Sequence, residues 1–197
     1  MNQNLVMNGL LKYLSNIINL SSEANEHILS ISKQIKLEKG DLLISQGNKV
    51  NSIYFIDEGC MRSFSRDENG KEATLCFGIK NSLISDFRSI HNNQLSGLTI
   101  ECVKKASIIE FKSVDFYRAL ERFPKLDVVH RKHLELRVSD LEKRILGQLI
   151  LPASARYEKF LKYYSEIEPL VPNYCIASFL GITQESLSRI RFEISTR

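Results

Sequence analysis

The 197-residue sequence contains no tryptophan and only four cysteines, which are spread widely along the chain. They are Cys60, Cys76, Cys102 and Cys175. No C-x-x-C pair occurs, so the usual patterns of zinc sites, iron–sulfur clusters and redox-active dithiols are excluded. We therefore expect free, partly buried thiols in a cytoplasmic protein.

The four histidines form no recognisable set of ligands. His130 and His133 are one helical turn apart, a spacing that suits a metal ion, although such a pair is more often solvated. No haem ligand is evident either. The sequence therefore predicts no metal, haem or iron–sulfur cofactor.

Two further absences narrow the class of protein. The stretch from Met1 to Leu11 has no basic segment of the kind that begins a secretory signal, and no apolar run approaches the length of a membrane span. The motifs G-x-x-x-x-G-K-[ST], G-x-S-x-G and H-E-x-x-H are also missing. We expect a cytoplasmic protein with no membrane partner and no catalytic residues, and hence not an enzyme.

The composition permits several functions. Apolar residues make up 43% of the chain, charged residues make up 25%, and the net charge is +4. One or two domains with real hydrophobic cores are expected from these values. So small a net charge is compatible with nucleic acid, but any affinity would have to come from a local patch.

The segment from Ile176 to Arg191 has the pattern of two short helices joined by a turn. Gly181 lies where the chain must turn sharply, because a residue without Cβ adopts positive φ at little cost. Thr183 is placed to N-cap the second helix, and the small Ala177 lets the two helices approach. The apolar residues that can close a shared core are Ile176, Leu180, Ile182, Leu187 and Ile190.

This pattern resembles a helix-turn-helix, whose second helix lies in the DNA major groove. The residues that this helix would turn outward are Gln184, Glu185, Ser188 and Arg189. A plain helical hairpin with a glycine C-cap is the alternative. The small residue, the glycine, the cap and the apolar positions agree in register, which favours DNA recognition.

The rest of the chain begins as helix and continues as short strands. Helical spacing runs from Leu5 to about Ile35, with a helix-start signal at Ser21-Ser22-Glu23. From Lys36 to Phe111 the sequence has short β-like runs with frequent turns, which predicts an antiparallel barrel or jelly roll. The expected strands are Ile53–Ile56, Cys60–Arg66, Glu72–Phe77, Leu98–Val103 and Ser107–Phe111, with a turn at Asp57-Glu58-Gly59 and a hairpin at Asp67-Glu68-Asn69-Gly70.

A family resemblance emerges from these segments. Lys39 to Gly47 and Ile53 to Gly59 resemble the start of a cyclic-nucleotide-binding-type β-roll, which needs tight turns where Gly40, Gly47 and Gly59 fall. A following helix and the C-terminal helix-turn-helix complete the layout of the Crp/Fnr family of bacterial transcription regulators. Ser154 to Tyr157 and Ile176 to Arg191 are similar to the branch common in Bacteroidetes.

The resemblance implies an α+β fold in three parts. These are a jelly-roll-like antiparallel β-roll sensor domain with flanking helices over residues 1–124, a dimerisation helix over 125–151 and a helix-turn-helix domain over 152–197. The implied partners are double-stranded DNA, a second copy of the chain, RNA polymerase and a small-molecule effector of unknown identity. The β-hairpin wing that often follows the helix-turn-helix is expected to be short or missing.

Apolar residues between the two expected domains recur at steps of 4, 3, 4 and 4. They are Leu134, Val138, Leu141, Ile145 and Leu149. A helix packed on its own domain can carry such a stripe. The near-heptad spacing, together with the use that the family makes of this helix, favours a two-fold dimer interface.

The expected effector site departs from the family pattern. Members that bind cyclic AMP carry F-G-E-L and then R-S-A/T, in which the Glu holds the ribose and the Arg pairs with the phosphate. The corresponding residues here are Asp86 and Ser96, with Phe87 and Arg88 beside them. Asp86 could replace the Glu and Arg88 the Arg, or Asp86 could only cap a helix while Arg88 faces solvent. Because Ser96 lacks the charge for a bidentate bond, we expect that cyclic AMP does not bind in the standard way.

The recognition helix of cyclic-AMP-binding relatives begins R-E-T-V-G-R, and Gln184 to Arg189 keeps its Glu and second Arg. The resemblance therefore assigns base contacts to Glu185 and Arg189, whereas Arg191 is expected at phosphates or in solvent, like Lys159 and Lys162. The full set expected to contact DNA is Thr183, Gln184, Glu185, Ser186, Ser188, Arg189 and Arg191. The alternative function is a ligand-sensing roll that regulates a protein partner without binding DNA.

Overall fold

Two short helices precede the first strand. In the computed structural model, which describes residues 3–196, α1 spans Gln3–Ser15 and α2 spans Ser22–Ser30. Helix was predicted to about Ile35, but β1 already occupies Ser32–Leu37. This strand pairs antiparallel with β6 (Thr99–Lys112), and the long-range pairing overrides the local helical spacing.

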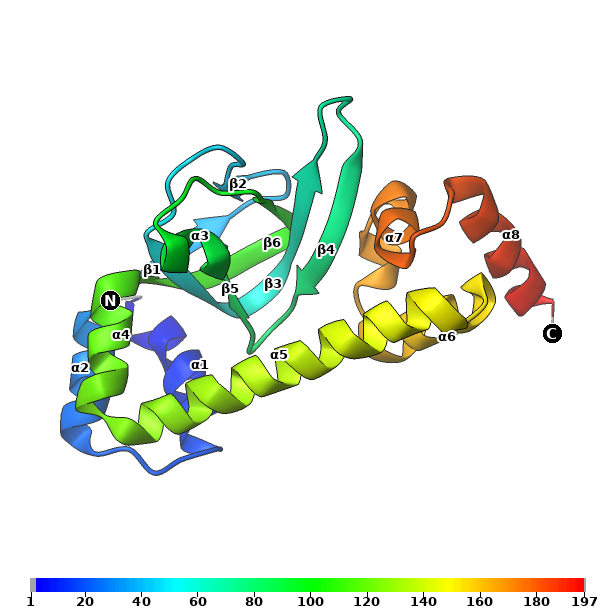
Figure 1. Ribbon diagram of the computed structural model, residues 1–197. Coiled ribbons are helices and arrows are strands. Elements are labelled where there is room, and N and C mark those ends of the chain that lie inside the picture. The colour runs from blue at the N-terminus through cyan, green and yellow to red at the C-terminus, as the bar shows by residue number, and fades with distance from the viewer. Residues whose placement is uncertain (1–2, 197) are drawn as a thin grey trace.

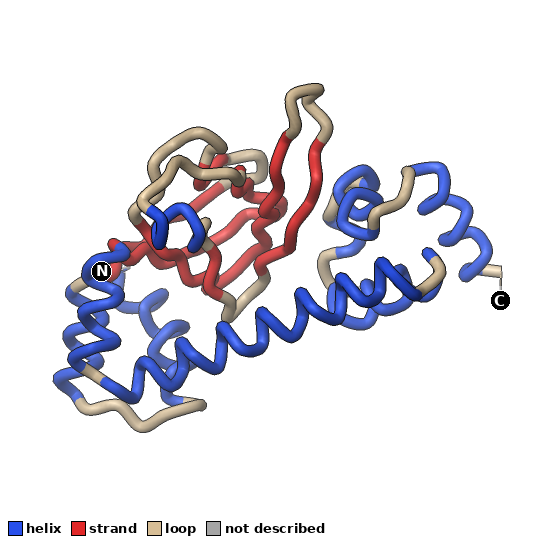
Figure 2. The backbone as a smooth tube through the Cα atoms, viewed as in Figure 1, coloured by secondary structure: helices blue, strands red, loops and turns tan. Residues whose placement is uncertain are grey.

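The β-roll is built from one antiparallel sheet, whose strands are red in Figure 2. The strand order is β1-β6-β3-β4; in addition, β2 pairs with β6 and β5 pairs with β3. The other strands are β2 (Leu42–Ile44), β3 (Ser52–Arg66), β4 (Glu72–Gly78) and β5 (Leu83–Ile84). A short helix, α3 (Phe87–Asn92), follows β5. The side chains of Ile56, Met61 and Ile100 are fully buried inside the roll, which leaves its interior filled.

The predicted turn at Asp57-Glu58-Gly59 is wrong, because β3 includes these residues and continues without interruption to Arg66. Gly59 has φ +95° and forms a β-bulge opposite the stretch between Lys104 and Ser107 of β6. A Cβ at this position would lie 2.5 Å from both Lys105 O and Ala106 Cα, so only glycine fits. The two strands predicted at Leu98–Val103 and Ser107–Phe111 are likewise one strand, β6, which bends with β3.

The predicted hairpin between β3 and β4 is confirmed. Asp67 N–H donates to Lys71 O at 3.0 Å, and Gly70 adopts φ +79° in the turn. The Asp67 carboxylate accepts the backbone N–H groups of Asn69 and Lys71, which closes the loop. β4 thereby becomes the last strand in the sheet order.

The longest element is α5 (Pro124–Ile150), which follows α4 (Ser113–Arg122). Pro124 stands at its first turn, where the fixed φ of proline suits a helix start. Its 27 residues give a length of about 40 Å. Figure 1 shows α5 running from the N-terminal helices, past the sheet, to the C-terminal helices.

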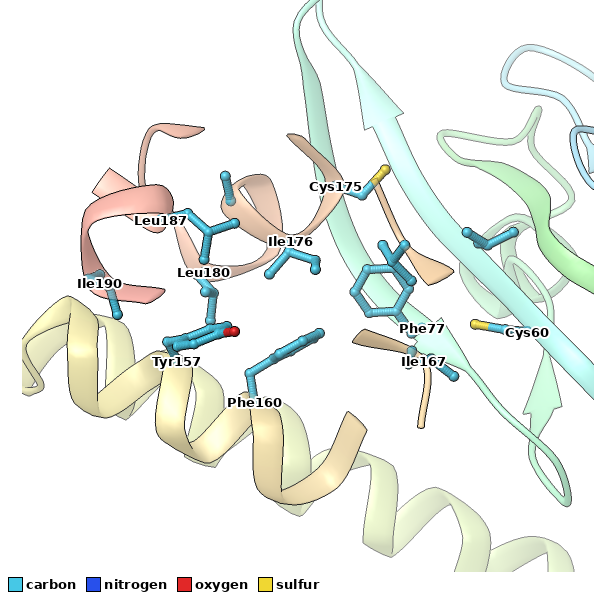
Figure 3. Packing of buried hydrophobic residues seen from close by; sticks show 13 residues of the cluster. Cys60, Phe77, Tyr157, Phe160, Ile167, Cys175, Ile176, Leu180, Leu187 and Ile190 are labelled. Atoms are coloured by element: carbon cyan, nitrogen blue, oxygen red, sulfur yellow. The ribbon is translucent and has the colours of Figure 1, made fainter. Parts of the chain in front are cut away.

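Four short helical elements form the C-terminal part. They are α6 (Ala153–Tyr164), the 3₁₀ turn η1 (Glu168–Leu170), α7 (Asn173–Leu180) and α8 (Gln184–Ser195). One hydrophobic cluster joins this part to the roll: Figure 3 shows Phe77 of β4 beside Phe160 of α6 and Ile167. The rings of Phe77 and Phe160 meet edge-to-face at 6.1 Å.

Polar contacts also fasten α7 to the outer edge of β4. The Ser178 hydroxyl accepts Thr74 N–H at 2.8 Å and donates to Glu72 O at 2.9 Å, as a neighbouring strand would. Arg144 of α5 donates to Thr74 O at 2.9 Å and also to Leu75 O. Four backbone groups of this edge strand, the Thr74 N–H and the carbonyls of Glu72, Thr74 and Leu75, are therefore satisfied by the helices.

The predicted fold class is confirmed: an α+β chain with an antiparallel roll, flanking helices, a long helix and a helical C-terminal part. All four cysteines are free and buried. Burial raises the pKa of Cys60 to about 12 and that of Cys102 to about 11, so these two thiols are protonated and inert at neutral pH.

Candidate nucleic-acid interface and effector region

The turn between α7 and α8 has the geometry that its sequence predicts. Gly181 adopts φ +67°, ψ +39°, and the Ile182 N–H donates back to Ala177 O at 3.0 Å. The Thr183 hydroxyl then accepts Ser186 N–H at 3.2 Å and caps α8. The predicted glycine turn and threonine cap are confirmed.

The two helices share a small apolar core. Ile176 and Leu187 are fully buried, and Leu180 and Ile190 are buried as well. Ile182, the fifth predicted core residue, is only half-buried but packs against this cluster, and the small Ala177 is buried between the helices. Figure 3 shows Leu180, Leu187 and Ile190 facing Tyr157 of α6. Burial of each large side chain contributes about 1.5–3 kcal/mol, so this core fixes the angle between α7 and α8.

The residues predicted to read DNA lie on the exposed face of α8. Gln184, Glu185, Ser188 and Arg189 are all exposed. The Arg189 side chain is 74% exposed, and its one ion pair among residues 3–196, with Glu193, is long at 4.0 Å. A hydrogen bond from its own backbone N–H holds the pKa of Glu185 below its ordinary value, so it is an anionic acceptor at neutral pH. Donor and acceptor groups are thus free to meet a partner.

Thr183 and Ser186, also predicted as DNA contacts, are partly engaged in the cap. The Thr183 hydroxyl donates to Ser186 Oγ at 3.1 Å while accepting its backbone N–H. The exposed Thr183 lies at the helix start, whereas Ser186 is half-buried. These two residues therefore shape the N-terminus of α8.

Sequence reasoning overlooked Phe192, whose aromatic side chain is 70% exposed on α8. It lies seven residues after Glu185 and three after Arg189, so it extends the same helix face by one turn. That seven-residue spacing was the signal that could have revealed it. Phe192 adds a large apolar surface to a face that is otherwise polar.

Arg191 differs from its expected position at phosphates or in solvent. Its guanidinium donates to Tyr157 Oη at 3.1 Å, to Asn173 Oδ1 at 2.6 Å and to the Glu168 carboxylate. Tyr157 Oη in turn donates to Glu168 at 2.9 Å. These bonds tie α8 to α6 and η1, and give Arg191 a structural position within the C-terminal part.

The apolar stripe on α5 is largely uncovered. Val138, Ile145 and Leu149 are 55%, 57% and 74% exposed, Leu134 is exposed as well, and Leu141 is half-buried. Opposite polar residues face inward: Arg137 donates to Cys76 Sγ at 3.1 Å, and Arg144 holds β4. The helix therefore packs on its own domain through Leu126 and Val129 near its start and through Arg137 and Arg144 further along, and it leaves much of its apolar stripe open.

The predicted effector residues come together around α3. Asp86 is 3% exposed and caps α3, and its carboxylate accepts the Ser89 N–H and hydroxyl, the Ser96 hydroxyl and the Gly97 N–H. Burial acts to raise the pKa of Asp86, but these hydrogen bonds outweigh it and hold the pKa below its ordinary value. The site therefore already contains a satisfied anion.

Arg88 and Phe87 complete this region. A Cβ at Gly97 would lie 2.6 Å from Arg88 Nη2, so the guanidinium covers the loop that carries Ser96. Phe87 begins α3 and is half-buried. Asp86, Arg88 and Ser96 are thus neighbours in space, although Asp86 and Ser96 bond to each other.

His130 and His133 are both half-buried, and each contacts another part of the protein. His133 Nε2 accepts Leu83 N–H at 3.2 Å, and the His130 ring meets Phe116 edge-on at 5.3 Å. Burial lowers the pKa of both side chains, which keeps them neutral at pH 7. Among residues 3–196, no three His, Cys, Asp or Glu side chains gather as a metal site would require. None of the helices described there is long and apolar enough to cross a bilayer.

The roll matches a known family of domains in sequence. Residues 34–123 match the family model of the cyclic nucleotide-binding domain. The anaerobic regulatory protein of Haemophilus influenzae is 23% identical over 171 residues, which cover 81% of this chain and 66% of that protein, just under two thirds.

Several solved structures have the same fold over most of this chain. FixK2 from Bradyrhizobium japonicum has a TM-score of 0.73 at 15% identity, covering 84% of this chain and 85% of that one. The c-di-GMP-responsive regulator CLP from Xanthomonas campestris has a TM-score of 0.72 at 12% identity, covering 89% and 92%. A putative Crp/Fnr-family regulator from Eubacterium rectale has a TM-score of 0.71 at 18% identity, covering 93% and 88%. At these identities the likeness establishes a common fold.

Proposed function

We propose that this chain, a Crp/Fnr-type protein by its cyclic nucleotide-binding domain and its fold, is a homodimeric transcription regulator that binds specific DNA sequences. The observation that carries the proposal is the exposed face of α8 on a well-formed helix-turn-helix. Leu187 and Ile190 close the core, while the polar residues and the aromatic Phe192 are exposed on the opposite face. An exposed aromatic ring beside exposed charged groups is typical of a binding surface.

The chemistry of this face fits the edges of base pairs. An Arg can bind G O6 and N7 together, a Glu can accept from C N4, and a Phe can contact the thymine methyl group. Arg189, Glu185 and Phe192 supply these three groups from one exposed face. Gln184, Ser188 and the N-terminus of α8 are placed for further contacts to bases or phosphates, and the exposed Lys159 and Lys162 for phosphates.

Dimerisation through α5 would present two copies of α8 to the DNA. The exposed stripe of Leu134, Val138, Ile145 and Leu149 is an apolar surface of the kind that a partner helix covers. A two-fold dimer matches a palindromic operator with half-sites about 34–36 Å apart. RNA polymerase is a further partner if the protein acts as an activator.

We infer that cyclic AMP does not bind in the standard way. Its phosphate would approach the donors of Ser96 and Gly97, which already hold the Asp86 carboxylate at 3.0 Å each. Two anions at one set of donors repel each other, and Ser96 offers no compensating charge. Titration calorimetry with cyclic AMP and cyclic GMP tests this inference, and micromolar or tighter binding would contradict it.

Selection of duplexes from random DNA tests the main proposal. We expect enrichment of a palindrome with half-sites separated by about 10–10.5 base pairs, and an affinity that falls with salt as phosphate contacts are screened. If the protein neither enriches a sequence nor is retained on DNA at low salt, the proposal fails. That result would leave the alternative of a ligand-sensing roll that regulates a protein partner.

A further inference from the structure

A cavity of about 430 Å³ lies where the roll, α5 and the C-terminal helices meet. Its volume is within the range of about 300–1,000 Å³ that is typical of small-molecule sites. β4 contributes Leu75 and Phe77, α6 contributes Phe160 and Tyr164, and α7 contributes Phe179. The cavity is separate from the Asp86 region, since neither Asp86 nor Ser96 lines it.

The charges around this cavity are mostly positive. Arg137, Lys143, Arg144, Arg156 and Lys159 line it, and Asp140 is its single acidic residue. Asp140 pairs with Lys143 at 3.6 Å. Among the residues that the structure describes, Arg137 and Arg144 have no carboxylate within ion-pair distance. The lining therefore has an excess of cations beside an apolar wall.

The surroundings of Arg144 illustrate this excess of positive charge. Its guanidinium donates to the carbonyls of Thr74 and Leu75, yet its buried Nε has no partner. Burial lowers the pKa of Arg144, and the nearby Cys76 and Tyr164 offset only part of this effect. Arg137 bonds only to the Cys76 sulfur, a weak acceptor for a group with five donors. An anion in the cavity would satisfy both side chains.

We propose that this cavity binds an organic carboxylate with an apolar body, whose head group pairs with Arg137 and Arg144 and whose body lies against Leu75, Phe77 and Tyr164. Charge-assisted bonds to arginine are the strongest polar contacts that the cavity can make. The aromatic and aliphatic wall excludes water from them and accommodates the apolar part of the ligand.

Such a ligand would touch three parts of the chain at once. The wall combines β4 of the roll, the α5 helix, and α6 and α7 of the C-terminal part. Because the ligand binds only where these parts come together, it stabilises the arrangement in which α7 is docked on β4. The cavity is therefore positioned to couple occupancy to the placement of α8. Binding itself is measured on the free protein, so the test does not depend on the proposed DNA binding.

Calorimetric titration with decanoate, decanol and decylammonium tests the proposal, because the three probes share one apolar chain and differ in head-group charge. We expect decanoate to bind and the other two to bind at least about tenfold more weakly, since one bond to a charged group is worth about 1.5–3 kcal/mol. Arg137→Gln should weaken decanoate by about tenfold or more. Arg137→Lys keeps the charge but loses the planar fork, so its affinity should lie between those of Arg137→Gln and wild type.

Two further variants separate the cavity from the surface charge. Leu75→Trp fills the cavity and should abolish binding. Lys132→Gln removes an exposed charge from α5 outside the cavity and should leave binding unchanged. Circular dichroism and gel filtration check that each variant is folded. The proposal is overturned if decanoate does not bind, if decanol or decylammonium binds as tightly, or if folded Arg137→Gln binds decanoate as wild type does.

Discussion

Replacement of Arg189 by Ala should remove sequence preference without weakening the fold. The side chain is 74% exposed and its ion pair with Glu193 is 4.0 Å long, so its loss changes the free energy of unfolding by no more than about 0.5 kcal/mol. A bidentate contact to guanine contributes about 1–3 kcal/mol of discrimination. A dimer uses the contact twice, which makes about 2–6 kcal/mol, or a loss of about thirtyfold to ten-thousandfold in operator preference.

Fluorescence anisotropy at one salt concentration provides the measurement, with the selected operator and a scrambled duplex as the two ligands. The ratio of the two affinities should collapse in Arg189→Ala while weak, salt-sensitive binding to both duplexes persists. Arg191→Ala is the matched control, because it removes the same group two residues further along α8. It removes the ion pair of the half-buried Glu168, which keeps only its hydrogen bond from Tyr157, and should cost about 1–3 kcal/mol of stability instead. An unchanged affinity ratio in Arg189→Ala would refute the assigned contact.

The remaining predictions concern the dimer, the roll and its buried carboxylate. The double variant Leu141→Asp, Ile145→Asp should sediment as a monomer and lose operator binding, because two carboxylates would be desolvated in the dimer interface on α5. Wild-type protein that sediments as a monomer at micromolar concentration would exclude the dimer. Gly59→Ala should lower the free energy of unfolding by about 1–3 kcal/mol or more in urea titrations, and by clearly more than Gly40→Ala, which has the same φ of +95° but nothing within 4 Å of the new Cβ. Because the folded pKa of Asp86 is depressed, its stabilising effect is present above the ordinary carboxyl pKa of about 3.9 and is lost as pH falls through the folded value. Asp86→Asn should therefore flatten this acid limb of the stability curve, and an unaltered limb would contradict the assigned hydrogen bonds.

The helix-turn-helix was predictable because its signals are local. Gly181 and Thr183 act within four residues of themselves, and the apolar spacing reports which helix face is buried. The hairpin at Asn69-Gly70 was predictable for the same reason. Each of these features depends on conformational preferences that a short peptide already has.

Apart from Phe192, the features that sequence reasoning missed depend on partners far along the chain. Asp57-Glu58-Gly59 has the composition of a turn, and only the neighbouring strand β6 decides that Gly59 forms a bulge. Arg191 looks like any surface cation until Glu168 and Tyr157 are brought beside it. The 430 Å³ cavity has walls from five separate helices and strands, so no single segment of the sequence predicts it.

The hydrogen bond to the Ser178 hydroxyl makes the backbone amide of Thr74 a reporter of movement of the C-terminal helices. Any excursion that lifts α7 from β4 must break the bond from Thr74 N–H to Ser178 Oγ, and the freed amide of an edge strand then meets water. Its hydrogen exchanges for deuterium only during such openings, so the exchange rate reports how often they occur. Amides on the inner strands β3 and β6, which stay paired during the movement, supply the reference rate within the same molecule.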